Sequence, residues 1–230
     1  MSMPFYVSPE QVMKDRADYA RKGIARGRSL VAMEYADGIA LVAENPSNTL
    51  RKVSEIYDRI AFAGVGRYSE FEQLRIAGVR HADLKGYSFS REDVDARGLA
   101  NAYAQILNQV FTHEIKPLEV EILVAEVATP EGGSHDQLFH ILYDGTVMDE
   151  KGFTVLGGQA EVIIDDMKAK YSDGLDMGGA IRLGAKALGE PDGREIAADQ
   201  LEVAVLDRNR TRRKFRRLDD DEVAALLSAG

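Results

Sequence analysis

The sequence of 230 residues contains no cysteine. This absence excludes disulfides, thiolate metal sites and a cysteine nucleophile, and it suits a reducing compartment. The chain also lacks any apolar segment close to the ~20 residues that cross a bilayer, and its N-terminus has no basic region followed by an apolar run. We therefore expect a cytoplasmic protein with neither a secretion signal nor a membrane partner.

Positive charge is scarce relative to negative charge. The chain has 29 lysines and arginines against 38 aspartates and glutamates, a formal net charge of −9. This balance argues against a surface that binds nucleic-acid phosphates throughout. One basic run stands out, residues 208–217 (RNRTRRKFRR). We interpret it as an exposed edge hairpin that its cations keep soluble; the alternative, a nucleic-acid patch, predicts salt-sensitive binding.

Signals for metals, cofactors and a serine nucleophile are also weak. The histidine spacing fits no zinc motif and no carboxylate cluster accompanies it, so we expect no metal and surface positions for His81, His113, His135 and His140. Residues 64–69 (GVGRYS) lack the third glycine and the lysine of phosphate-binding loops, which predicts a plain strand-to-helix turn. No Gly-x-Ser-x-Gly elbow occurs, and no cofactor is expected.

Apolar periodicity predicts the order of helices and strands. A helix is predicted over residues 9–22, capped by Ser8, begun by Pro9 and ended by Gly23. The predicted strands are residues 29–35, 38–44, 52–56, 59–65, 120–127, 138–143, 146–156, 201–206 and 214–218. Helices are predicted around 68–82 and 99–110, over 160–171 and 175–188, and over 220–227.

This order predicts an α+β fold with a single domain. The elements follow the order strands, two helices, strands, two helices, strands. Two antiparallel sheets packed face to face, with a pair of helices on each outer face, account for this order because every sheet face is then covered. We therefore expect a four-layer αββα sandwich with an extra N-terminal helix. In such a sandwich the remaining route to nucleophilic catalysis is a nucleophile at a processed N-terminus, whose own α-amine is the base.

Six segments closely resemble the α-type subunits of actinobacterial proteasomes, in order and spacing, along nearly the whole chain. They are residues 8–11 (SPEQ), 20–26 (ARKGIAR), 42–47 (VAENPS), 52–59 (KVSEIYDR), 99–105 (LANAYAQ) and 201–207 (LEVAVLD). The resemblance implies the fold of N-terminal-nucleophile hydrolases, with a gate tail at 1–8, a leading helix at 9–23 and the sandwich at 28–230. It further implies a homo-heptameric α ring that flanks rings of catalytic β-subunits.

The resemblance implies that the chain itself is not the protease. The position at which a β-subunit carries its threonine nucleophile falls near Arg28, which has no hydroxyl and, being mid-chain, no free amine. We therefore expect no catalytic residue in this subunit of a threonine-type endopeptidase complex. The alternative, an autonomous N-terminal-nucleophile hydrolase, requires processing of the chain.

Two functional surfaces follow from the resemblance. Lys52 matches the lysine that receives the C-terminal carboxylate of an activator in a pocket between neighbours, and Arg21 and Lys22 are expected to add positive potential nearby. Arg67 departs from the apolar residue of archaeal relatives. The implied partners there are a proteasomal ATPase ring or an ATP-independent activator, which deliver unfolded or pupylated proteins.

The second implied surface is the N-terminal tail. Tails of this family converge over the ring axis and close the entrance, and Pro9 resembles the proline that turns the chain between gate and helix. Met3, Phe5 and Tyr6 are expected to pack against copies from neighbouring subunits. The Tyr-Asp-Arg motif of archaeal and eukaryotic tails is absent, so the closed arrangement is expected to differ from theirs.

Overall fold

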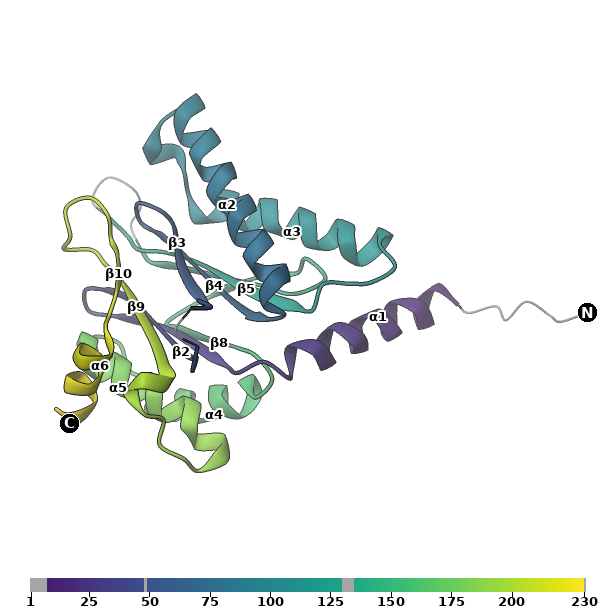
Figure 1. The fold of residues 1–230 in the computed structure, drawn as a ribbon. Coiled ribbons are helices and arrows are strands. Elements are labelled where there is room, and N and C mark those ends of the chain that lie inside the picture. Colours follow the sequence, from purple (N-terminus) through teal and green to yellow (C-terminus); the bar gives the residue numbers. More distant parts are fainter. Residues whose placement is uncertain (1–7, 48, 130–134, 230) are drawn as a thin grey trace, which may run out of the picture.

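Two antiparallel five-stranded sheets lie face to face between two layers of helices, as expected from the order of elements (Figure 1). The computed structural model describes residues 8–47, 49–129 and 135–229. The first sheet has the order β10 (Phe215–Arg217), β9 (Leu201–Asp207), β2 (Gly38–Glu44), β1 (Leu30–Tyr35) and β8 (Phe153–Leu156). The second sheet has the order β3 (Val53–Tyr57), β4 (Ile60–Gly66), β5 (Val120–Glu126), β6 (Gln137–Ile141) and β7 (Val147–Glu150).

The central strands β1, β2, β4, β5 and β9 are almost wholly buried because both faces of each sheet are covered. Along β1, Leu30 and Ala32 belong to the core between the sheets, whereas Val31 and Met33 belong to the core under the helices. The first sheet is covered by α4 (Ala160–Lys170), α5 (Met177–Gly189) and α6 (Asp220–Ser228), and the second by α2 (Tyr68–Ser88) and α3 (Ala96–His113). Short 3₁₀ turns occur at Arg91–Asp93, Glu190–Asp192 and Ala198–Gln200.

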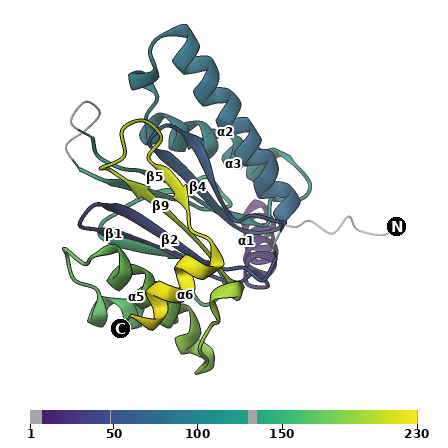
Figure 2. The same cartoon turned by 60° about the vertical axis from the view of Figure 1, so that its left-hand side comes forward.

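The leading helix α1 (Pro9–Ile24) lies at one end of the sandwich and points away from it (Figures 1 and 2). Ser8 caps it by accepting a hydrogen bond from the Gln11 amide at 3.2 Å, and proline occupies its first turn, as predicted. Its buried residues Ala20 and Ile24 join the core between the two sheets. The helix therefore closes one end of the core that the sheets share.

The segment 146–156, expected as one strand, is two strands in different sheets. β7 pairs with β6, and β8 pairs with β1. Gly152 lies between them with φ +74°, a conformation that glycine adopts without strain, and it turns the chain from one sheet to the other. The prediction was wrong here because it joined the apolar residues on either side across the polar residues 149–151 and Gly152, where the chain turns.

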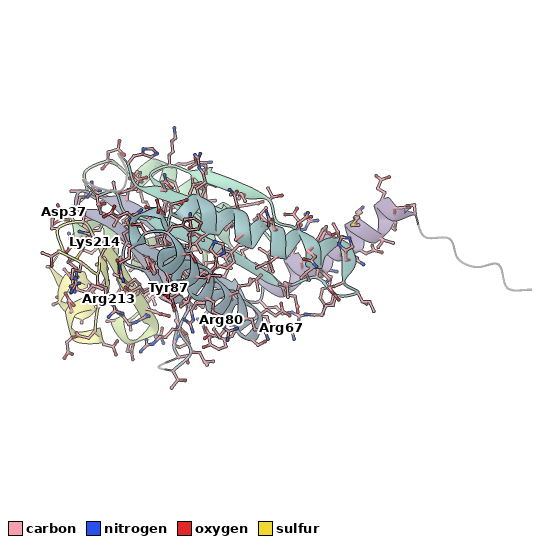
Figure 3. The ribbon with its side chains drawn as sticks, turned by 90° about the horizontal axis from the view of Figure 1, so that it is seen from above. Asp37, Arg67, Arg80, Tyr87, Arg213 and Lys214 are labelled. Atoms are coloured by element: carbon pink, nitrogen blue, oxygen red, sulfur yellow. The ribbon has the colours of Figure 1, made fainter. Side chains whose placement is uncertain are left out.

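The basic run lies at the edge hairpin that was predicted, between β9 and the edge strand β10. Figure 3 shows Arg213, Lys214 and Asp37 at the end of the molecule away from α1. Four of its arginines pair with carboxylates of this chain: Arg208 with Asp136 at 2.8 Å, Arg213 with Glu55, Arg216 with Glu222 and Arg217 with Glu202. These ion pairs neutralise most of the positive charge that binding to nucleic-acid phosphates would need.

The histidines lie where expected with one exception. His81, His113 and His135 are exposed, but His140 is buried on β6, with its Nε2 atom 3.5 Å from Oε2 of Glu121. The surface prediction for His140 was wrong because both faces of β6 are covered. Within residues 8–47, 49–129 and 135–229, no three His, Cys, Asp or Glu side chains are grouped as a metal site would require. Nor does any helix of this part combine the length and apolar character needed to cross a membrane.

Candidate functional site

Lys52 immediately precedes β3, at the end of the sandwich that α1 also occupies, and its side chain is partly buried. Its Nζ atom donates a 2.7 Å hydrogen bond to the carbonyl oxygen of Arg28, the residue that leads into β1. The amine therefore connects the start of β3 in one sheet with the start of β1 in the other. An ammonium group has three N–H donors, and the Arg28 carbonyl accepts from one of them, so the others are available to a ligand.

The backbone around Lys52 is fixed by a buried carboxylate on the opposite sheet. Glu202 of β9 accepts hydrogen bonds from the amides of Lys52 at 2.8 Å and Val53 at 3.2 Å. The Asn45 side chain donates to the same carboxylate at 2.7 Å, and Arg217 pairs with it. The side chain of Glu202 is only 1% exposed, so these donors replace water for a charge that would otherwise be costly to bury. The position of Lys52 is thus set before any partner binds.

A second carboxylate, Glu44 at the end of β2, lies between two arginines. Arg28 pairs with one oxygen, and Arg194 donates to the other at 2.7 Å. Burial alone would raise the pKa of Glu44, but the Arg194 hydrogen bond and the charges of Arg28 and Arg194 outweigh it and lower the pKa. Glu44 is therefore an ionised partner of two cations and a poor proton acceptor.

The ionisation of Lys52 reflects its surroundings. Burial lowers its pKa from 10.5 to about 8, against the opposing effect of the charges on Glu44 and Glu202, and Arg28 lowers it further. Lys52 is the lysine whose charge changes closest to neutral pH among the shifts resolved for the described residues. A carboxylate ligand would restore the charged form by direct pairing.

Beside this site a cavity of 210 Å³ opens between the end of α1 and the start of α4. Its lining consists of Ala25, Gly27, Arg28, Ser29, Glu44, Gln159, Leu188, Asp192 and Arg194. Ser29 is the one hydroxyl in this lining, and the lining has neither an imidazole nor a free amine that could activate it. The cavity can hold a small polar group.

Arg21 and Lys22 are both exposed near the end of α1. Arg21 pairs with Asp18 at 3.2 Å, and within the described residues no hydrogen bond or ion pair joins either cation to Lys52. Arg67 occupies the N-cap position of α2, and its side chain pairs with Glu119 at 2.7 Å. A single copy of the chain therefore does not bring Arg21, Lys22 or Arg67 to the Lys52 amine, and their contribution to a pocket between neighbours stays a prediction.

The expected gate residues divide into two groups. Pro9 begins α1 directly after the Ser8 cap, at the end of the molecule from which the tail starts. Met3, Phe5 and Tyr6 lie outside the described residues. Their packing stays a prediction from the sequence.

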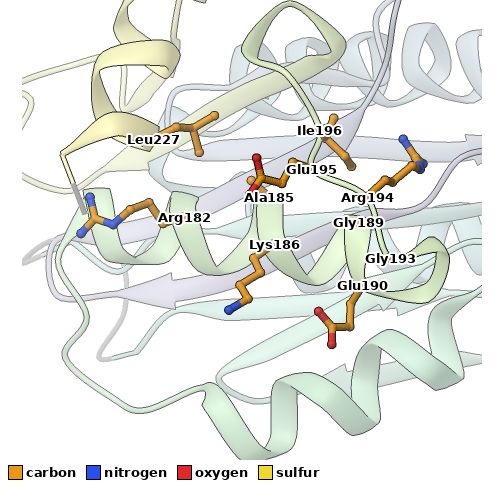
Figure 4. Close-up of a pocket in the computed structure, with 10 residues that line it drawn as sticks. All are labelled: Arg182, Ala185, Lys186, Gly189, Glu190, Gly193, Arg194, Glu195, Ile196 and Leu227. Atoms are coloured by element: carbon orange, nitrogen blue, oxygen red, sulfur yellow. The ribbon is translucent and has the colours of Figure 1, made fainter.

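A larger cavity of 550 Å³ lies between α5, α6 and the turn after α5 (Figure 4). Arg182 in its wall donates to the carbonyl of Leu226 at 3.0 Å, and Arg194 is already paired with Glu44. Serine, threonine and histidine are missing from its lining. Its lining shares only Arg194 with that of the smaller cavity.

Sequence reasoning singled out Lys52 as a candidate but did not single out the residues that hold it. Glu202, Glu44 and Arg194 were not singled out, although Glu202 interrupts an apolar strand and a buried charge needs a partner. That interruption was the available signal for Glu202. Nothing in the local pattern pointed to Arg194, whose partner Glu44 lies 150 residues away.

Comparisons with known proteins agree with this architecture. A family model described as "Proteasome subunit" matches residues 24–206. The chain is 62% identical over 229 residues to the "Proteasome subunit alpha" of Acidimicrobium ferrooxidans, covering 99% of this chain and 97% of that relative. It is 58% identical to the protein of the same name from Kineococcus radiotolerans, covering 99% of each chain, and 54% identical to that of Thermomonospora curvata, covering the whole of both.

Proposed function

Because this chain belongs to the proteasome subunit family, and is an α-subunit of the proteasome core, we propose that it forms the outer heptameric rings and controls entry to the catalytic β rings. As an α-subunit it is a component of a threonine-protease complex and assembles into rings with β-subunits. The proposed division is a gate at residues 1–8, a leading helix at 9–23 and the sandwich at 28–230. The cytoplasmic location also stays a proposal.

The observation that carries the proposed docking role is the fixed position of the Lys52 amine. Its backbone is held by buried Glu202, and its Nζ atom lies against the Arg28 carbonyl with donors to spare. An ammonium group on a rigid support gives the C-terminal carboxylate of a partner a charge-assisted bond at a definite place. The proposed partners are an ATPase ring or an ATP-independent activator that deliver unfolded or pupylated proteins.

The proposal that this subunit has no catalytic residue is supported by Arg28. It occupies the position near which the related β-subunits carry a nucleophile, and its guanidinium is paired with Glu44. Neither a hydroxyl nor a free amine is present at this residue. The alternative, an autonomous N-terminal-nucleophile hydrolase, would need a newly exposed N-terminus elsewhere in the chain.

One experiment separates the two functions. The α chain is purified alone and together with β-subunits, treated with a threonine-directed epoxyketone, and measured by intact mass. We expect the α chain to keep its unprocessed mass and to remain unlabelled in both samples, while the β chain is labelled and peptide hydrolysis appears only with β. A processed or labelled α chain would overturn the assignment.

A further inference from the structure

Glu121 of β5 is a charged residue in the layer between the two sheets. Its neighbours in the strand, Val120 and Ile122, belong to the core under α2 and α3, so the Glu121 side chain is on the opposite face, toward the first sheet. This side chain is only 15% exposed, and within the described residues no lysine or arginine pairs with it. Burying a carboxylate without a cation is costly, which indicates a role that an apolar residue could not fill.

The Glu121 carboxylate reaches the corner between β8 and α4. Its Oε2 atom accepts a 3.2 Å hydrogen bond from the amide of Gly157, the residue that follows β8. The Nε2 atom of His140, on the neighbouring strand β6, lies 3.5 Å from the same oxygen. The bond to Gly157 therefore joins β5 of the second sheet to the end of β8 in the first.

Gly157 and Gly158 lie directly against the segment 25–29, which connects α1 to β1. β8 pairs with β1, so the residue after β8 comes beside the residue before β1. A Cβ atom on Gly157 would lie 3.0 Å from both Cα and Oγ of Ser29, and one on Gly158 would lie 2.6 Å from Cα and the carbonyl oxygen of Ala25. These distances are shorter than ordinary van der Waals contacts. The corner thus touches the segment through its backbone, where any side chain would intervene.

The segment 25–29 is also enclosed on another side. A Cβ atom on Gly27 would lie 3.1 Å from the amide nitrogen of Gly66, the last residue of β4. Because the segment has close neighbours from both sheets, a displacement of the corner would also displace Arg28. The carbonyl oxygen of Arg28 is the acceptor that lies 2.7 Å from Nζ of Lys52.

We propose that Glu121 is a positioning residue for the Lys52 amine. By accepting from the Gly157 amide, Glu121 keeps the corner against residues 25–29, and this contact fixes the Arg28 carbonyl beside which the amine lies. The inference rests on the proposed docking role of Lys52. It adds to that role a residue that acts through Gly157 and Arg28 and not through contact with the ligand carboxylate.

Two substitutions isolate the hydrogen bond of Glu121. Glu121→Leu is close in size but has no acceptor, whereas Glu121→Gln keeps a side-chain oxygen that can accept from Gly157. The measurement is the rate at which trace acetic anhydride acetylates Lys52 in particles assembled with β-subunits, followed by mass spectrometry across a pH range. Only the neutral amine reacts, so the midpoint of the rate profile reports the pKa of Lys52, which burial lowers to about 8.

We expect Glu121→Leu to raise this midpoint by about one pH unit, because a displaced amine is better hydrated. One unit corresponds to acetylation about tenfold slower at pH 7. Glu121→Gln should keep the midpoint of the unmodified protein. An unchanged midpoint in assembled Glu121→Leu particles would overturn the proposal, as would equal shifts in the two variants.

The glycine corner supplies a second test that does not alter Glu121. Gly157→Ala and Gly174→Ala are a matched pair: φ is +111° and +81°, so alanine is strained at both, but only at Gly157 does the added Cβ meet Ser29. At Gly174 no atom lies within 4 Å of it. Gly157→Ala should shift the Lys52 midpoint and Gly174→Ala should not. Equal effects of the two substitutions would overturn the proposal, because backbone strain alone would then account for them.

Binding of a tail peptide separates this inference from the docking role itself. The probe is a fluorescent peptide with the C-terminal residues of an activator and a free carboxylate, and its amidated form measures the binding that does not use the carboxylate. Glu121→Leu and Gly157→Ala should weaken the free form about tenfold and the amidated form little. A shifted midpoint with unchanged peptide affinity would support the positioning role of Glu121 and refute docking at Lys52. An unshifted midpoint refutes the positioning role at any affinity.

Discussion

The Nζ atom of Lys52 lies 2.7 Å from the carbonyl oxygen of Arg28, across the end of the two sheets. Arg28 contributes its carbonyl oxygen to Lys52 and its guanidinium to Glu44. The interactions at this end of the sandwich therefore hold the Lys52 amine in place, as the proposed docking role requires.

Replacing Lys52 by alanine should abolish stimulation by an activator whose tail ends in a carboxylate. A charge-assisted hydrogen bond contributes about 1.5–3 kcal/mol, so the affinity of the tail should fall roughly 10- to 150-fold. Assembly should be unchanged, because Glu202 bonds the Lys52 backbone and not its side chain. The measurement is activator-stimulated peptide hydrolysis, with Lys168→Ala, at an exposed lysine of α4, as control. Undiminished stimulation by Lys52→Ala would count against the docking site.

Activator docking should weaken as pH rises through 8. Burial lowers the pKa of Lys52 to about 8, so the amine is mostly charged at pH 7 and mostly neutral at pH 9. The ligand carboxylate stays ionised over this range, and the affinity should therefore fall about tenfold between these values. The measurement is the affinity of a tail peptide at each pH. In Lys52→Arg this affinity should depend little on pH, because the guanidinium remains charged. The same slope in both proteins would assign the titration to another group.

Glu202→Gln should destabilise the α chain and disturb the docking site together. The substitution removes the charge that Arg217 pairs with, while Asn45 and two backbone amides still converge on the position. Breaking a buried ion pair costs about 3–5 kcal/mol, which corresponds to a Tm lower by roughly 6–20 °C. Thermal unfolding checks this, with Glu195→Gln, at an exposed glutamate, as control. Equal Tm values for the two variants would show that Glu202 does not hold this end of the sheets together.

Deleting Met1 to Val7 should raise hydrolysis of short peptides by particles assembled with β-subunits. The gate proposal attributes restricted entry to these residues, so removing them leaves the entrance open without altering the catalytic chains. Rates are normalised to β active sites counted with an epoxyketone. The triple variant Met3→Ser, Phe5→Ser, Tyr6→Ser keeps the tail length and should raise the rate as well, because apolar packing is lost. No change in either protein would refute the gate.

The local sequence pattern was enough to predict most of the helices and strands. The cap at Ser8, the periodic helices and the apolar strands follow from short-range spacing, and the turn at residues 36–38 (ADG) ends in Gly38, whose φ of +152° admits few other residues. The absence of a nucleophile at Arg28 is also a property of the sequence. Six ordered segments were sufficient to indicate the family, which the comparisons confirm.

Only the tertiary structure decided how the site is held. Glu202 accepts a hydrogen bond from the Lys52 amide although the two residues are 150 positions apart in the sequence, and the same separation holds for Arg194 and Glu44. Local periodicity carries no information about contacts at this separation. The segment 146–156 changes sheet at Gly152, and the buried position of His140 depends on cover from distant elements. Burial and charge pairing arise when remote segments pack, so the lowered pKa of Lys52 is a property of the fold and not of its neighbours in sequence.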